Sequence, residues 1–112
     1  MAIPTGAGTE VLKRITLHAN NNTWTEVLSG SADHIYTILS IIFCDEQGAT
    51  GTIAIRINDG SNDISILSGQ ATGASATFVW NDKFVLSEDD DLDVYNSVTS
   101  GDWYITYIDQ HF

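Results

Sequence analysis

The pattern of apolar and polar residues along the chain is typical of a β protein. The segment TIAIRIN, Thr52–Asn58, alternates strictly, so that Ile53, Ile55 and Ile57 share one face, as in a half-buried strand. The turn-forming residues 58–60 separate this segment from a second alternating run, DISIL, and the order strand, turn, strand predicts a hairpin. A helical period is not evident anywhere in the chain.

A longer run, HIYTILSIIFC, is apolar at nearly every position and rich in isoleucine. Because β-branched residues favour strands over helices, Ile35–Cys44 is predicted to be a central strand covered on both faces. The other predicted strands are bounded by Gly, Asn, Ser or Asp, and they are residues 11–18, 23–28, 63–67, 77–80, 83–87, 92–96 and 103–108. About nine short strands indicate an all-β fold, an antiparallel two-layer β-sandwich of the jelly-roll type.

The length of 112 residues suits one domain with its own core. Residues 10–112 are predicted to form a single β-sandwich domain. Residues 1–9 are predicted to be an extended N-terminal arm, because Pro4, Gly6 and Gly8 leave little to bury there. The stretch Ser68–Thr77, rich in Gly, Ala, Ser and Thr, is interpreted as a long surface loop.

The charge balance narrows the classes of partner. Lys and Arg total 4 against 15 Asp and Glu, a formal net charge of -11. So few scattered bases cannot form a phosphate-binding surface, so we expect no nucleic-acid partner, and anionic membranes are disfavoured for the same reason. The longest apolar run is about half of a membrane span, and the first residues lack a signal-peptide pattern, which favours cytosol-like conditions. The single cysteine, Cys44, excludes an internal disulfide and is expected to be an inert core residue.

The segment SEDDDLDVYN places five carboxylates within six residues. If Leu92 and Val94 point inward, Asp91 and Asp93 share the opposite face and Asp89 extends the row, which would gather oxygen ligands suited to calcium. A calcium loop would also need a glycine at its tight turn and a closing glutamate, and neither is present. The favoured interpretation is therefore a solvated turn that enters a strand, with Asp89, Asp91 and Asp93 as weak candidates for a metal site.

The chain shows no pattern that points to catalysis. The three histidines are far apart, and there is no Gly-x-Ser-x-Gly elbow or phosphate-binding loop, so we expect neither enzymatic activity nor a cofactor. Trp24, Trp80 and Trp103 could form an aromatic platform for a sugar ring. Because Trp103 alternates with Ile105 and Tyr107, the favoured interpretation places the tryptophans in the core or in subunit contacts.

Four phrases of the sequence carry a family resemblance: MAIPTGAGTEVLKR, ADHIYTILSIIFCDEQG, FVWNDKFVLSEDDDLDVY and WYITYIDQ. Together they resemble small virion structural proteins of tailed bacteriophages, particularly those of marine phages. In such proteins a Gly-Asp turn leads into the last strands, and a terminal YI(D/E)Q closes the sheet. Here the acidic segment occupies the place of that turn, and Asp90 stands where glycine is common. The resemblance covers most of the chain.

The resemblance implies a capsid decoration (cement) protein that is made in the host cytoplasm and joins the virion. Such a protein binds the major capsid protein at the outer capsid surface and stabilises capsomer junctions, with a homotrimer as the favoured state. Ile3, Pro4 and Thr5 of the arm are the predicted contacts to a neighbour. The resembling proteins are not enzymes, so no catalytic residue is implied. A neck, tail or fibre-associated virion protein and a carbohydrate-binding receptor module are the alternatives.

Overall fold

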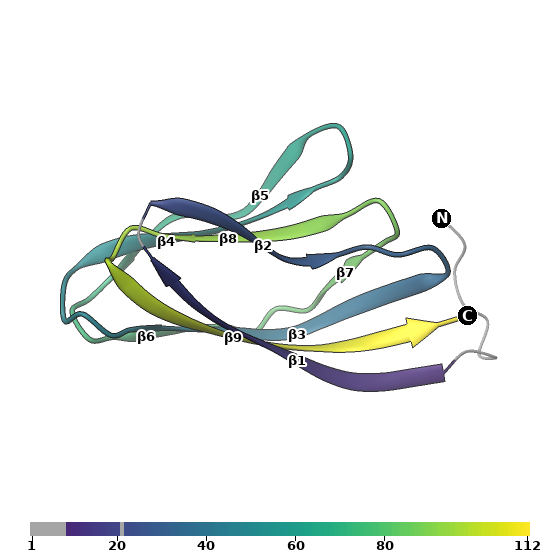
Figure 1. Cartoon of the computed structure of the whole chain (residues 1–112), viewed down its shortest axis with the longest axis horizontal. Coiled ribbons are helices and arrows are strands. Elements are labelled where there is room, and N and C mark those ends of the chain that lie inside the picture. Colours follow the sequence, from purple (N-terminus) through teal and green to yellow (C-terminus); the bar gives the residue numbers. More distant parts are fainter. Residues whose placement is uncertain (1–8, 21) are drawn as a thin grey trace.

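The computed structural model describes residues 9–20 and 22–112, and this part of the chain contains nine strands and no helix. The strands form two antiparallel sheets packed face to face (Figure 1), which confirms the predicted β-sandwich. Their bounds are β1 Thr9–Asn20, β2 Thr23–Ser29, β3 His34–Asp45, β4 Gly51–Asn58, β5 Asp63–Thr72, β6 Thr77–Trp80, β7 Phe84–Leu86, β8 Asp91–Asn96 and β9 Ser100–His111.

The strand order identifies the sandwich as a jelly roll. Sheet A has the order β1-β9-β3-β6, with β7 also paired to β3, and sheet B has the order β2-β8-β4-β5. The antiparallel pairs are therefore nested: β1 with β9, β2 with β8, β3 with β6 and β7, and β4 with β5. Two interlocked Greek keys produce this arrangement.

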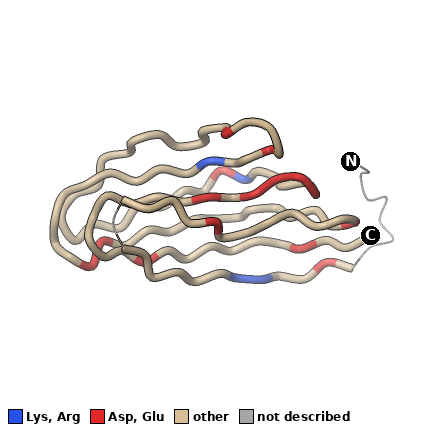
Figure 2. Tube along the Cα trace, turned by 45° about the horizontal axis from the view of Figure 1, so that its top comes forward, with Lys and Arg blue, Asp and Glu red and all other residues tan. Residues whose placement is uncertain are grey.

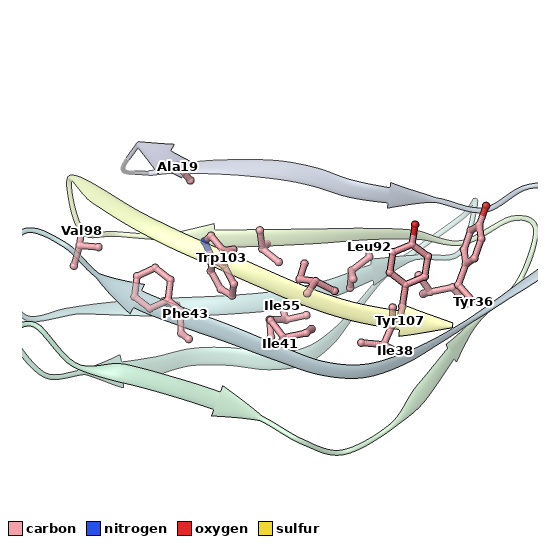
Figure 3. Close-up of a cluster of buried hydrophobic side chains, with 14 residues drawn as sticks. Ala19, Tyr36, Ile38, Ile41, Phe43, Ile55, Leu92, Val98, Trp103 and Tyr107 are labelled. Carbon is pink, nitrogen blue, oxygen red and sulfur yellow. The ribbon is translucent and has the colours of Figure 1, made fainter. Parts of the chain in front are cut away.

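The core lies between the inner faces of the two sheets, where Phe43 and Trp103 pack with ring centroids 4.8 Å apart (Figure 3). A buried amide, that of Asn96, accepts a 3.2 Å hydrogen bond from the Trp103 indole and donates a 3.0 Å bond to the carbonyl of Val98. Burying each large apolar side chain contributes about 1.5–3 kcal/mol. The other fully buried side chains are Ile38, Ile41, Ile53, Ile55, Leu86, Leu92, Val94 and Ile105.

The hairpin predicted from turn chemistry is present between β4 and β5. The backbone N–H of Asp59 donates to the carbonyl of Asn62, and the Asp59 carboxylate accepts the N–H groups of Ser61 and Asn62. These backbone hydrogen bonds lower the pKa of Asp59. Gly60 adopts a φ of 95°, a conformation that glycine tolerates without steric cost.

The predicted loop over Ser68–Thr77 is wrong in its first half, because β5 continues through Thr72. The register shows how the strand accommodates these residues: Ile53 pairs with Gln70 and Ile55 with Leu67, so β5 holds one extra residue. Gly69 lies within this bulge with a φ of 62°. Small residues at this position thus permit a bulged strand rather than a loop.

The strand predicted around Ile35–Cys44 is confirmed as β3, which lies between β9 and the pair β6 and β7. Only its inner face is covered, however, and Ile42 and Cys44 on the outer face are half-buried. The expectation of two covered faces, and of Cys44 as a core residue, is therefore wrong. The many apolar residues of β3 occupy both the core and an outer surface.

Candidate functional site

The acidic segment forms a turn followed by a strand, as predicted. The backbone N–H and the hydroxyl of Ser87 both donate to the Asp90 carboxylate, at 2.8 and 3.0 Å. The carbonyl of Asp90 accepts a 2.7 Å hydrogen bond from the N–H of Gly30, which ties the turn to the end of β2. Asp90 thus stabilises the turn.

Beyond the turn, Leu92 and Val94 are buried, and Asp91 and Asp93 lie on the outer face of sheet B, as predicted. Asp91 accepts a 2.7 Å hydrogen bond from Ser29, and Asp93 accepts a 3.1 Å bond from Arg56. Asp89 stays in the turn and is exposed. These carboxylates do not form a group of three converging ligands within residues 9–20 and 22–112.

On this outer face the carboxylates of Asp91 and Asp93 repel the carboxylate of Glu26 on β2. The charge of Asp91 raises the pKa of Glu26, and partial desolvation and the charge of Asp93 add to the rise. A carboxyl group whose pKa is raised by folding binds its proton more tightly in the folded state. The free energy of unfolding linked to Glu26 therefore falls as the pH rises through and above the ordinary pKa of a glutamate.

The double substitution Asp89→Asn, Asp91→Asn is expected to change the free energy of unfolding by no more than about 0.5 kcal/mol. A small increase is the favoured direction, because the change relieves repulsion at Glu26. Thermal unfolding with and without calcium measures this, and calcium should have no specific effect. A saturable calcium-dependent rise in Tm that the double variant lacks would contradict the turn interpretation.

The predicted contact residues of the arm, Ile3, Pro4 and Thr5, lie outside the described residues. β1 already begins at Thr9, one residue before the predicted start of the domain.

The outer face of sheet A carries a patch that is unusual for so acidic a protein. Three rows of outward side chains cross the sheet, and the middle row contains Arg14. Two rows are largely apolar: Thr16, Tyr104, Ile42 and Val79 in one, and Leu12, Ile108, Thr37 and Val85 in the other. We name as the apolar face the six residues Leu12, Ile42, Val79, Val85, Tyr104 and Ile108.

Four members of the apolar face are well exposed, Leu12 by 69%, Val85 by 49%, Val79 by 47% and Tyr104 by 41%. None of the three rows contains a carboxylate. Acidic positions instead gather in the turns and near strand ends, as Figure 2 shows. Alternation within Trp103–Ile108 indicates that Tyr104 and Ile108 point away from the core, so these two members of the apolar face could be found from the sequence.

The three tryptophans are separated by the fold. Trp103 is in the core, and Trp80 packs at the edge of the core with its indole bonded to the carbonyl of Asp82. Trp24 is exposed on the outer face of sheet B, 5.4 Å from Tyr95 between ring centroids. The Arg56 guanidinium lies 3.9 Å above the Trp24 ring, so one face of this indole is already occupied.

A second polar cluster, which sequence reasoning missed, joins His18 of β1 to Ser100 and Asp102 of β9. His18 Nδ1 lies 2.7 Å from Asp102 Oδ1, and His18 Nε2 lies 3.2 Å from Ser100 Oγ. Glu46, just after β3, is 3.2 Å from the same Ser100 hydroxyl. The hydrogen bond to Asp102 raises the pKa of His18, desolvation opposes the rise, and Glu46 adds to it.

The order serine, histidine, aspartate in this cluster is that of a hydrolytic triad, but the protonation pattern differs. The Glu46 carboxylate can only accept a hydrogen bond, so the Ser100 hydroxyl donates its proton to Glu46 and its oxygen is left to accept from His18 Nε2–H. A triad serine instead donates its proton to the histidine. Ser100 is also only 8% exposed. The geometry therefore does not favour Ser100 as a nucleophile.

At the opposite end of sheet A, Asp109 is buried and accepts hydrogen bonds from Lys13 at 2.8 Å and from His34 at 2.7 Å. Burial disfavours the charged form of Asp109, but the bonds from His34 and Lys13 outweigh this effect and lower its pKa. The His34 ring also stacks on His111 with centroids 4.5 Å apart. This cluster ties the beginnings of β1 and β3 to the end of β9.

The surface of residues 9–20 and 22–112 has no pocket. In the same residues no helix occurs that is long and apolar enough to cross a membrane.

Comparisons with known proteins identify the fold class. No family model matches the chain, and no curated protein matches its sequence. Among solved structures, the chain is similar to a protein of Bacillus endospore appendages, which form a family of disulfide-linked pili. The similarity covers 99% of this chain and 95% of that chain, with a TM-score of 0.55 and 11% sequence identity. At this identity the likeness shows a shared β-sandwich fold.

Proposed function

We propose that this protein is a self-associating structural subunit of a bacteriophage virion and that it decorates the outer surface of the capsid. The apolar face is the observation that carries the proposal. Exposed apolar patches on soluble proteins mark surfaces that a partner covers. The resemblance of four phrases of the sequence to phage virion proteins favours a virion as the place of assembly.

The charge distribution favours a second copy of this chain as the occupant of the apolar face. Each copy carries a formal charge of -11, so two copies repel one another wherever their carboxylates meet. The three rows on sheet A hold no carboxylate and one base, Arg14, so contact there keeps the acidic groups apart. A basic partner would instead be attracted to the acidic turns.

The size of the apolar face sets the strength of this contact. The apolar face and the middle row between its two parts together cover roughly 400 Å², because four strands lie about 4.8 Å apart and three rows about 7 Å apart. A stable interface of standard size buries about 800 Å² on each partner. The face alone therefore supports weak association, and the arm is proposed to add to the contact.

The symmetry of the oligomer depends on what the apolar face meets. Matching the face with itself is an isologous contact and gives a two-fold dimer. The trimer implied by the resemblance would match it with a different surface of the neighbouring copy. Sedimentation equilibrium distinguishes these two assemblies by mass.

The structural neighbour supports the general idea that such a sandwich can be an assembly subunit, since the endospore appendage protein forms pili. A continuous chain of disulfides requires at least two cysteines in each subunit. These 112 residues contain one, Cys44. We therefore propose association through side-chain packing and not through a series of disulfides.

The test of the virion proposal is the amount of this protein relative to the major capsid protein in purified particles. A copy number comparable to that of the major capsid protein indicates decoration. A few copies per particle indicate the alternative, a neck, tail or fibre-associated protein. Absence from the particles would overturn both.

A carbohydrate-binding module is the second candidate, because Trp24 and Tyr95 form an exposed aromatic pair on sheet B. Such a pair can stack on a sugar ring with the Trp24 face that Arg56 leaves open. Titration of immobilised oligosaccharides with the wild type and with Trp24→Ala tests this candidate. Binding that the substitution abolishes would favour it over an adhesive role alone.

A further inference from the structure

The cluster of His18, Glu46, Ser100 and Asp102 lies on the outer face of sheet A, at the end far from the C-terminus (Figure 1). Strand pairing places three of these side chains. His18 of β1 pairs directly with Asp102 of β9, and Ser100 precedes Asp102 by two residues on the same face. The backbone of Glu46 is held next to β9, because its N–H donates a 3.2 Å hydrogen bond to the carbonyl of Ser100.

The possible ligand atoms in this cluster converge. His18 Nδ1 is 2.7 Å from Asp102 Oδ1 and 3.6 Å from Glu46 Oε2, and each of the three side chains offers one ligand atom within 4.8 Å of the other two. In a tetrahedral zinc site with bonds of about 2.0–2.1 Å, ligand atoms are about 3.3 Å apart. The three side chains are all partly exposed, His18 by 60%, so small rotations can reach that spacing.

The cluster also contains a partner that orients the imidazole. Ser100 Oγ is 3.2 Å from His18 Nε2 and 3.2 Å from Glu46 Oε2. When Nε2–H donates to Ser100 and the serine hydroxyl donates to Glu46, Nδ1 is the nitrogen directed at the two carboxylates. Metal-binding histidines are held in this manner by a hydrogen bond from their second ring nitrogen. Ser100 is buried, so its position is set by the fold.

We propose that His18, Glu46 and Asp102 bind a divalent transition-metal ion of the Zn²⁺ type, with Ser100 as a positioning residue. One imidazole nitrogen and two carboxylate oxygens suit zinc better than calcium or magnesium, which prefer oxygen ligands throughout. The bound cation neutralises two carboxylates held close together and takes the place of the proton on His18 Nδ1. Three protein ligands leave a coordination position open to water.

Calorimetric titration of the chelator-treated protein with zinc chloride tests the proposal. We expect one equivalent of Zn²⁺ to bind saturably, and His18→Gln to weaken binding at least tenfold. Ser100→Ala should also weaken it by roughly tenfold, as loss of an orienting partner does. Calcium chloride at the same concentrations should bind far more weakly.

Two matched variants separate this site from other places where zinc can bind. His111→Gln removes a histidine elsewhere on sheet A, and Cys44→Ser removes the thiol of the residue paired with Asp102 on β3. The affinity of both variants for Zn²⁺ should stay within about twofold of the wild type, well short of the tenfold losses expected at His18 and Ser100. The proposal is overturned by absence of saturable binding, by unchanged binding in His18→Gln, by loss of binding in either control, or by calcium that binds as tightly as zinc.

Discussion

Aspartates introduced together at Val79 and Tyr104 are expected to abolish self-association of this protein. Both side chains are exposed on the apolar face, which contains no carboxylate in the wild type. Burying new like charges against a second copy costs several kcal/mol, which is roughly a 100-fold or greater loss of affinity. Sedimentation velocity over a range of protein concentrations measures this loss. Because both sites are on the surface, the far-ultraviolet circular dichroism should not change.

Val79→Asp and Tyr104→Asp should each weaken association when introduced singly, and Ile64→Asp is the matched control for these single variants because it adds the same one negative charge. Ile64 is about as exposed as Val79, but it lies on β5 of sheet B. The control changes the net charge equally and should leave association within about twofold of the wild type. Equal loss of association in the control would mean that total charge, and not the apolar face, governs assembly. A wild type that stays monomeric at all concentrations, with and without its arm, would contradict the proposed interface.

Replacement of Asp109 by asparagine is expected to lower the free energy of unfolding by about 2–3 kcal/mol at neutral pH. The substitution removes two charge-assisted hydrogen bonds and leaves Lys13 and His34 without their anion. Urea unfolding of wild type and variant measures the difference. Asp63→Asn is the control. Asp63 is exposed and its ion pair with Arg56 is 3.6 Å long, so the loss of this ion pair should lower the free energy of unfolding by less than about 0.5 kcal/mol.

The same contact predicts a dependence on pH. The pKa of Asp109 is lowered in the folded protein, so the stability it supplies is fully present above the ordinary pKa of an aspartate, about 3.9. That stability is lost as the pH falls through the lower folded value. The difference between wild type and Asp109→Asn should therefore shrink in acid below about pH 4. A difference that stays constant down to the acid transition would contradict the proposed role of the Asp109 charge.

Local pattern predicted the strands of this fold well, because alternation and turn chemistry act within a few residues. The run Thr52–Asn58 and its turn appear as β4 and the following hairpin, and Leu92 and Val94 point inward as expected. The bulge at Gly69 was not predictable from alternation, because one extra residue shifts the pattern and makes a strand resemble a loop.

The polar clusters could not be predicted for a different reason. His18 meets Asp102 only because β1 pairs with β9, and 84 positions separate the two residues. His18 ends the predicted strand 11–18 and Asp102 directly precedes the predicted strand 103–108, but the register between distant strands depends on the whole fold. Cys44 illustrates the same limit, since an apolar sequence environment does not reveal which face of a strand a second sheet covers.

The pairing of β1 with β9 also delays the folding of the growing chain. Lys13 and Asp109 are 96 positions apart, so β1 leaves the ribosome long before the strand that pairs with it. Contacts over such separations slow folding, and during that interval Ile15 and Leu17 lack their native partners on β9. Intermediates with unpaired strands associate readily. The formal charge of -11 opposes that association through mutual repulsion, so the acidic composition is expected to raise the yield of folding.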